Sequence, residues 1–283
     1  ILAHYYQLPE IQKIADEIGD SLALSKIAAK TDKDIIVFCG VRFMAETAKL
    51  LSPHKKIIFP VSNARCAMAD MIDTYHVYNI KQVYPDVPIV CYVNSSVYVK
   101  AQSDICCTSR NAVQIVQGMP DKRIIFLPDM NLANYVSGCV LDKEIIPLDG
   151  YCPVHDKIGI EDVKKARGEH PYAQILVHPE CTMDVLENAD FVGGTGAIIK
   201  YISASSKSEF VIGTELGIMY ILKDLYPDKV FHAIAPDLVC PDMKLTTLYD
   251  LYNGILYEKE DIQIEEDIMQ RAAIPLNRMF NAV

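Results

Sequence analysis

The sequence predicts an α/β fold of three homologous αβα domains, each built on a parallel sheet and arranged with pseudo-threefold symmetry around a central cavity. Two observations predict it. Short apolar runs rich in β-branched residues alternate with helical stretches along all 283 residues, which favours parallel sheets with right-handed crossovers. The same order of elements also occurs three times, and each repeat ends in one cysteine, at Cys66, Cys152 and Cys240.

Each repeat opens with a short apolar run that ends in polar residues, at 1–6, 89–94 and 175–180. Runs of this kind are typical of buried parallel strands. Their last residues, Tyr6, Asn94 and Glu180, are spaced 88 and 86 residues apart. Ligands of open α/β sheets bind beyond the carboxyl ends of the strands, so we expect these three positions to face the central cavity.

A helix follows each of these strands, and an aspartate closes the helical stretch at Asp16, Asp104 and Asp190. Five residues later comes a hydroxyl residue, at Ser21, Ser109 and Thr195, where a second helix is expected to begin. A helix start offers free N–H groups and a positive dipole end, so three of them can hold a substrate with several carboxylate or phosphate groups. Ordinary N-capping is the alternative role, and both can hold for one residue.

Two further strands with a helix between them complete each repeat. The strands are predicted at 35–38, 124–127 and 210–213 and again at 57–59, 145–147 and 230–232, with helices over 43–46, 132–135 and 216–219. Each unit is therefore expected to be a βαβαβ layer that ends in its cysteine loop. The domains should span 1–86, 87–172 and 173–283, the last with a C-terminal helix. The chain begins inside an apolar run at Ile1, so we expect a short N-terminal piece to be missing.

The composition excludes several classes of protein. A net charge of −10 argues against binding to a nucleic-acid backbone, which needs a basic face. No apolar run approaches the ~20 residues that span a bilayer. Nine cysteines without a CxxC pair indicate reduced thiols in the cytoplasm, some of them metal ligands. The six cysteines outside the repeat register are expected in the core: Cys39, Cys91, Cys106, Cys107, Cys139 and Cys181.

The three equivalent cysteines suit a metal centre. Thiolates select iron–sulfur clusters, zinc or copper(I). A [4Fe–4S] cluster held by three cysteines keeps one iron open, and that iron is a Lewis acid suited to removing hydroxide from carbon. The alternative is three buried structural cysteines. Because their spacing matches no local motif, the internal symmetry carries the metal interpretation.

Acid and base groups are expected around the same cavity. His178 and Glu180 are two residues apart on one strand, so both side chains point to one face, and an imidazole beside a carboxylate forms an acid/base pair. His4 and His155 also lie at expected cavity positions, although a single histidine is often only a structural hydrogen-bond partner. Tyr6 and Tyr92 are suited to donate to or orient a carbonyl group. The remaining histidines are expected at the surface or in loops: His54, His76, His170 and His232.

Eight short stretches together resemble the quinolinate synthase family. They are Ala3-His4-Tyr5-Tyr6-Gln7, Ile18-Gly19-Asp20-Ser21-Leu22, Phe43-Met44-Ala45-Glu46-Thr47-Ala48, Cys66-Ala67-Met68-Ala69, Tyr92-Val93-Asn94-Ser95-Ser96, Thr108-Ser109 with Asn111-Ala112-Val113, Val177-His178-Pro179-Glu180-Cys181 and Gly213-Thr214-Glu215. The resemblance implies a triangular set of αβα domains around a [4Fe–4S] cluster. It also implies condensation of iminoaspartate, received from an aspartate-oxidising enzyme, with dihydroxyacetone phosphate. The products would be quinolinate, phosphate and water, on the route to NAD.

The resemblance also assigns roles to residues. Cys66, Cys152 and Cys240 would be the cluster ligands, and Lys200 would add positive charge. The substrate contacts would be His4, Tyr6, Ser21, Tyr92, Asn94, Ser109, His155, His178, Glu180 and Thr195, of which Tyr6, His4, Glu180 and His178 would be catalytic. Three residues depart from the family pattern, because Tyr5 and Arg110 add bulk and Gly194 replaces a common serine. The CxxCxxC of some members is absent at Cys240, so its regulatory disulfide is not expected.

Two other functions remain open from the sequence. One is a non-catalytic iron–sulfur sensor or carrier, which needs the cysteines but not the pair His178 and Glu180. The other is a metal-free sugar-phosphate isomerase or lyase, which needs the anion-binding helix starts and the acid/base pair but not Cys152.

Overall fold

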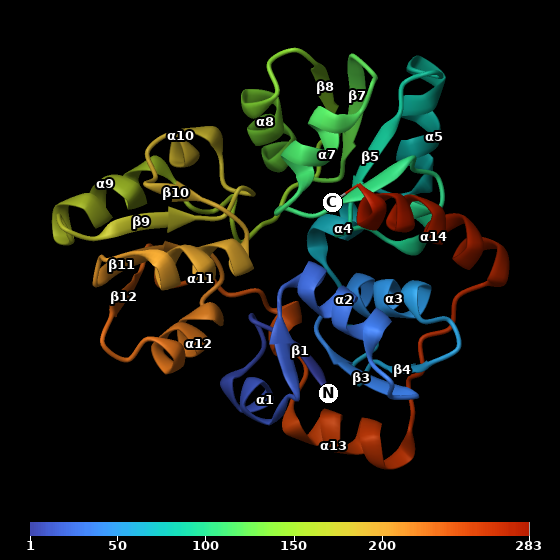
Figure 1. The fold of residues 1–283 in the computed structure, drawn as a ribbon, viewed down its shortest axis with the longest axis horizontal. Coiled ribbons are helices and arrows are strands. Elements are labelled where there is room, and N and C mark those ends of the chain that lie inside the picture. The colour runs from blue at the N-terminus through green and yellow to red at the C-terminus, as the bar shows by residue number, and fades with distance from the viewer. Residues whose placement is uncertain (283) are drawn as a thin grey trace.

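The computed structural model describes residues 1–282 and contains three four-stranded parallel sheets. Their strand orders are β2-β1-β3-β4, β6-β5-β7-β8 and β10-β9-β11-β12, so one topology occurs three times. Figure 1 shows the three units as blue, green and yellow-to-orange lobes. This arrangement confirms the predicted α/β class with three αβα units. The strands are β1 (Leu2–His4), β2 (Glu17–Gly19), β3 (Ile35–Cys39), β4 (Lys56–Ile58), β5 (Ile89–Tyr92), β6 (Ile105–Cys107), β7 (Arg123–Leu127), β8 (Glu144–Pro147), β9 (Gln174–Val177), β10 (Phe191–Val192), β11 (Glu209–Gly213) and β12 (Val230–Ala233).

Each unit has one strand more than the sequence predicted. The additional strands β2, β6 and β10 lie at one edge of their sheets, between the aspartate and the hydroxyl residue of each repeat. The prediction of a βαβαβ layer was wrong here because these strands are two or three residues long, too short to show a period-2 hydrophobic pattern.

The repeated aspartates fasten the beginning of the first strand in each unit. The Asp104 carboxylate accepts from the N–H of Ile89 at 2.8 Å, and the Asp190 carboxylate accepts from the N–H of Ile175 at 2.7 Å. The Asp16 carboxylate contacts the Ile1 nitrogen at 2.6 Å. Side-chain acceptors thus satisfy strand N–H groups at the same place in the second and third sheets.

Helices cover both faces of the sheets, so the inner strands are almost fully buried: every residue of β1 and β5 is buried. The helices are α1 (Pro9–Ile14), α2 (Ser21–Lys30), α3 (Arg42–Leu51), α4 (Ala67–Met71), α5 (Thr74–Val83), α6 (Val97–Lys100), α7 (Ala112–Gly118), α8 (Met130–Cys139), α9 (Ile160–Glu169), α10 (Met183–Leu186), α11 (Thr195–Ala204), α12 (Ile218–Leu225), η1 (Asp242–Lys244), α13 (Leu248–Tyr257) and α14 (Glu266–Asn281).

Two helices that follow the third sheet in the chain pack elsewhere. The C-terminal helix α14 contacts α3, α6 and β6, so it lies across the first and second units, as the red ribbon in Figure 1 shows. The helix α13 packs against β3 of the first unit. Conversely, α9 precedes the third sheet, yet its Val163 and Ala166 join the core of that sheet. The boundaries 1–86, 87–172 and 173–283 stay a prediction, and these helices show how the units are fastened together.

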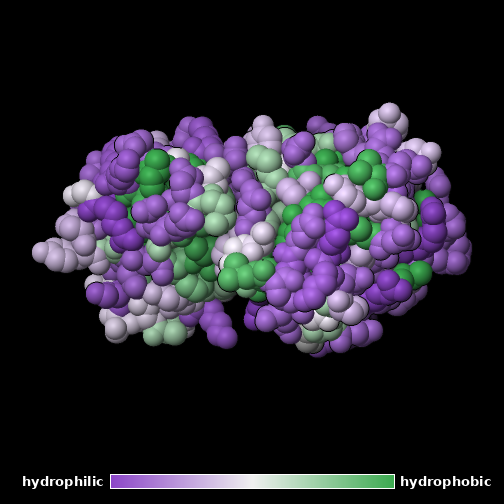
Figure 2. Space-filling view, turned by 90° about the horizontal axis from the view of Figure 1, so that it is seen from above, coloured by the Kyte–Doolittle hydropathy of each residue, from purple (hydrophilic) through white to green (hydrophobic). Residues whose placement is uncertain are grey.

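Figure 2 shows one face of the molecule as mostly hydrophilic, with hydrophobic residues in separate patches. Within residues 1–282, no helix combines the length and the apolar character that crossing a bilayer requires.

Candidate active site

A cavity of about 180 Å³ lies between the three units, and all thirteen site residues predicted from the sequence line it. Three of them lie at the carboxyl ends of the central strands: β1 ends at His4, β5 ends at Tyr92, and β9 ends at Val177, one residue before His178. The repeat register was therefore a reliable guide to which residues meet. The exposed Lys200 is not among the lining residues, and the positive charge expected from it stays a prediction.

The three register cysteines reach the cavity from loops. Cys66 caps α4, Cys152 follows β8, and Cys240 precedes η1. Burial raises the pKa of all three thiols, that of Cys66 to about 12. Repulsion from a negative charge on Cys240 also raises the pKa of Cys66. Thiols with raised pKa values stay protonated at neutral pH. They become thiolates only when a bound metal compensates their negative charge.

The spacing of the sulfur atoms discriminates between metal centres. They do not form a set within 4.8 Å of one another, although the ligand atoms of Cys152, His155 and Glu180 do. One tetrahedral zinc ion with bonds of ~2.3 Å requires its thiolates within ~4 Å of each other. The three sulfur atoms therefore lie too far apart to bind one tetrahedral zinc ion together.

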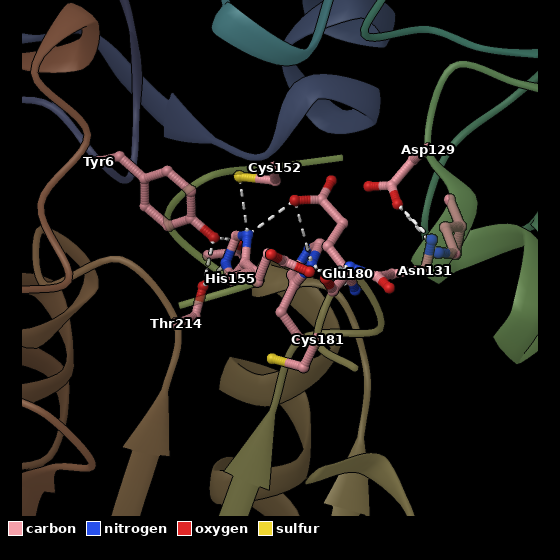
Figure 3. A network of polar contacts seen from close by, with 12 residues as sticks. Tyr6, Asp129, Asn131, Cys152, His155, Glu180, Cys181 and Thr214 are labelled. Carbon is pink, nitrogen blue, oxygen red and sulfur yellow. Dashed lines mark hydrogen bonds and ion pairs between the residues drawn. The ribbon is translucent and has the colours of Figure 1, made fainter. Parts of the chain in front are cut away.

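Polar side chains from different units form one hydrogen-bonded chain in the cavity (Figure 3). The Tyr92 hydroxyl donates to Glu180 Oε1 at 2.6 Å. Glu180 Oε2 lies 2.7 Å from His155 Nδ1. His155 Nε2 lies 2.7 Å from Thr214 Oγ1, which lies 2.6 Å from the Tyr6 hydroxyl. The Tyr6 hydroxyl also meets Thr195 Oγ1 at 2.8 Å.

The surroundings of these groups determine their charge. Burial opposes ionisation of Glu180, but the two neighbouring imidazoles and the hydrogen bonds it accepts outweigh burial and lower its pKa to about 2. Burial is the main cause that lowers the pKa of His178 and of His4 to about 3, and burial raises that of Tyr6 and Tyr92 well above 10. At neutral pH Glu180 is thus a carboxylate, His4 and His178 are neutral imidazoles, and the two phenols are protonated.

The sequence reasoning missed two further residues that support this chain. Thr214 is fully buried at the end of β11, inside the motif Gly213-Thr214-Glu215, so that motif was the available signal. Asn131 donates to the Glu180 carbonyl oxygen at 3.2 Å and to Asp156 at 2.9 Å. It stands in the first turn of α8, behind the N-cap Asp129, and no sequence pattern pointed to it.

Glu215 fixes the loop of the third cysteine. Its carboxylate accepts from the N–H groups of Cys240 at 3.1 Å and Gly217 at 2.6 Å, and it pairs with Lys244 at 2.7 Å. Lys244 also donates to the Tyr6 carbonyl oxygen. The third cysteine loop is thereby fastened to the strand end of the first unit.

The predicted helix starts are correct for two of three repeats. α2 begins at Ser21 and α11 at Thr195, but α7 begins at Ala112, so Ser109 lies in the preceding turn. Asp20 caps α2 by accepting from Ala23 N–H at 2.8 Å.

The residues that depart from the family pattern are also placed. Arg110 lines the cavity and Tyr5 does not. A Cβ atom at Gly194 would lie 2.5 Å from Ser109 Oγ, so the missing serine side chain makes room for the second unit.

The remaining cysteines and histidines mostly follow the predictions. Five of the six other cysteines are buried, but Cys139 is exposed at the end of α8, so its predicted core position was wrong. His54 and His76 are exposed, and His170 and His232 are partly exposed.

Comparison with known proteins agrees with this geometry. A family model described as quinolinate synthetase A protein matches residues 1–281. The quinolinate synthase of Caldicellulosiruptor bescii is 51% identical over 99% of this chain and 92% of its own length. That of Alkaliphilus metalliredigens is 50% identical over the same shares, and that of Thermodesulfovibrio yellowstonii is 47% identical over 100% of this chain and 93% of its own length. The chain therefore belongs to the quinolinate synthase family, a family of enzymes in NAD biosynthesis.

Proposed function

We propose that this enzyme condenses iminoaspartate with dihydroxyacetone phosphate and releases quinolinate, phosphate and water. The observation that carries the proposal is the convergence of three cysteine thiols and the chain Tyr92–Glu180–His155–Thr214–Tyr6 on one cavity. A condensation with dehydration needs both a Lewis acid and groups that move protons, and this cavity offers residues for both.

Cys66, Cys152 and Cys240 would hold a [4Fe–4S] cluster. When bound, a cluster with three cysteine ligands supplies an open iron that acts as a Lewis acid on a leaving hydroxide. Two observations support this assignment: the three thiols are buried, and their sulfur atoms are spaced too widely for one zinc ion. Reduced thiols of this kind persist in the cytoplasm, where we place the reaction.

Glu180 is the group best suited to accept a proton. Its low pKa keeps it a carboxylate, and it already accepts hydrogen bonds from Tyr92 and His155. A proton taken from a substrate carbon stays on the Glu180 carboxyl group, while His155 Nδ1 and the Tyr92 hydroxyl orient that group and Thr214 holds His155 Nε2. The two buried phenols stay protonated and can donate to a carbonyl or imine of the substrate.

The anionic ends of the substrates need positive or N–H-rich surroundings. The start of α11 at Thr195 offers free backbone N–H groups, and Arg110 is a cation on the cavity wall. Iminoaspartate would arrive from an enzyme that oxidises aspartate, because an imine of this kind is formed by removing hydride from an amine.

The test is anaerobic reconstitution followed by iron and sulfide counts and an assay of quinolinate from the two substrates. We expect about four of each per chain and product formation. Cys152→Ser should lose the cluster and the product, whereas Cys139→Ser, the exposed matched control, should keep both. An intact cluster with no quinolinate would favour a sensor or carrier, and full activity of Cys152→Ser would favour a metal-free isomerase or lyase.

A further inference from the structure

A second group of metal-binding side chains lies in the third unit, outside the cavity. It consists of His170, Glu209 and His232, none of which lines the cavity. The three come from separate elements: His170 caps the end of α9, Glu209 begins β11, and His232 lies in β12. We call them the His170–Glu209–His232 cluster.

The backbone brings these residues together for reasons that the sheet register makes plain. Glu209 pairs with Val230 and Val211 pairs with His232 in parallel strands, so the side chains of Glu209 and His232 point to one face. Val211 shares that face and packs in the same core as Val163 of α9. The helix α9 therefore covers this face of the sheet, and His170 at its end lies next to Glu209, the first residue of β11.

The ligand atoms have the spacing of a tetrahedral metal site. Glu209 Oε1 lies 3.0 Å from His232 Nε2 and 3.5 Å from His170 Nδ1, and all three ligand atoms lie within 4.8 Å of one another. Zinc bonds of ~2.0–2.1 Å at tetrahedral angles place neighbouring ligand atoms ~3.4 Å apart. The two imidazoles are stacked with centroids 3.6 Å apart, so their planes are nearly parallel, and both rings must turn and separate before one ion can lie in both ring planes.

The charge at the cluster also favours a cation. Within residues 1–282, Glu209 has no lysine or arginine partner and contacts only the two histidines. Arg167, which lies three residues before His170 on α9, pairs instead with Asp190 at 2.6 Å. Side-chain exposures of 26–32% leave an open route for an ion and room for a water ligand.

We propose that the His170–Glu209–His232 cluster binds one divalent transition-metal ion, with zinc as the best match. Two imidazoles and one carboxylate form a borderline nitrogen and oxygen donor set that suits zinc. The ion would link the end of α9 to β11 and β12. It would thereby stabilise the packing of α9 on the sheet of the third unit.

The test uses the reconstituted holoenzyme and zinc chloride. Crystals soaked with zinc should show an anomalous peak between the three side chains. Calorimetry should show that zinc binds His232→Ala and Glu209→Gln about 10- to 100-fold more weakly than the unaltered enzyme. His76→Ala is the matched control, because His76 is an exposed histidine that contacts a carboxylate, Asp73 at 2.6 Å, but has no third ligand. Its zinc binding should equal that of the unaltered enzyme.

A second measurement keeps the proposal open to refutation if one variant folds poorly. Zinc should raise the melting temperature of the unaltered enzyme and of His76→Ala but not of Glu209→Gln, a change that keeps the side-chain volume. The proposal is overturned if the anomalous peak lies elsewhere or if Glu209→Gln binds zinc as the unaltered enzyme does. In either case the three residues form only a hydrogen-bonded group.

Discussion

Replacing Thr214 with valine tests the hydrogen-bonded chain at its centre. The Thr214 hydroxyl is fully buried and joins His155 Nε2 at 2.7 Å to the Tyr6 hydroxyl at 2.6 Å. Valine has nearly the same shape, so the change removes the hydroxyl without leaving a cavity. Tyr6 keeps Thr195 as a partner, but His155 Nε2 loses the partner that holds it.

Thr214→Val should destabilise the fold because it leaves His155 Nε2 without a hydrogen-bond partner. Losing one hydrogen bond lowers the free energy of unfolding by ~1 kcal/mol, and leaving a buried ring nitrogen without a partner lowers it by a further ~1–3 kcal/mol. We therefore expect a total decrease of about 2–4 kcal/mol. The His155 ring is then no longer held against Glu180. We therefore expect kcat to fall by about 10- to 100-fold with little change in iron content.

Thr246 provides the matched control. It is equally buried, and its hydroxyl has no hydrogen-bond partner among the described residues. Thr246→Val should leave kcat unchanged and alter the free energy of unfolding by less than about 1 kcal/mol, or raise it, because an unsatisfied hydroxyl is removed. Anaerobic urea unfolding and quinolinate formation measure the two effects. Equal stability and equal kcat in the two variants would refute the role assigned to Thr214.

Three other predictions concern Glu180, the two buried histidines and Gly168. Glu180→Gln keeps the shape but removes the charge, so quinolinate formation should fall by about 10²- to 10⁴-fold while iron and sulfide counts stay unchanged; retained activity would exclude Glu180 as the base. Because His4 and His178 have native pKa values of about 3, the unfolded chain binds more protons below its histidine pKa near 6.5. The free energy of unfolding should thus drop by roughly 2–3 kcal/mol from pH 7.5 to pH 5.5, and His178→Gln should remove about half of that drop, as urea titrations at each pH can check. Gly168 lies in the exposed last turn of α9, where an added Cβ atom meets nothing within 4 Å. Gly168→Ala should therefore increase the free energy of unfolding by ~0.5–1 kcal/mol and raise the melting temperature. A lower melting temperature would contradict the packing of α9 described above.

The sequence by itself determined most of what depends on local pattern. Apolar runs located nine of the twelve strands, and the repeat register accounts for twelve of the thirteen predicted residues that line the cavity, all except His155. This worked because the repeat fixes equivalent positions in each unit, and parallel sheets present the ends of their strands on one side. The three missed strands are too short to carry a periodic signal.

Only the tertiary structure decided which side chains touch. The Tyr6 hydroxyl meets Thr214, a residue 208 positions away, and Lys244 reaches back to Tyr6 across 238 positions. Such contacts depend on how the units dock, to within the few tenths of an ångström that separate a hydrogen bond from a gap. The same applies to α14, whose sequence position lies after the third sheet but whose apolar face packs on the second. No local period encodes the relative placement of three units, so the sequence predicted the architecture but not the hydrogen-bonded chain.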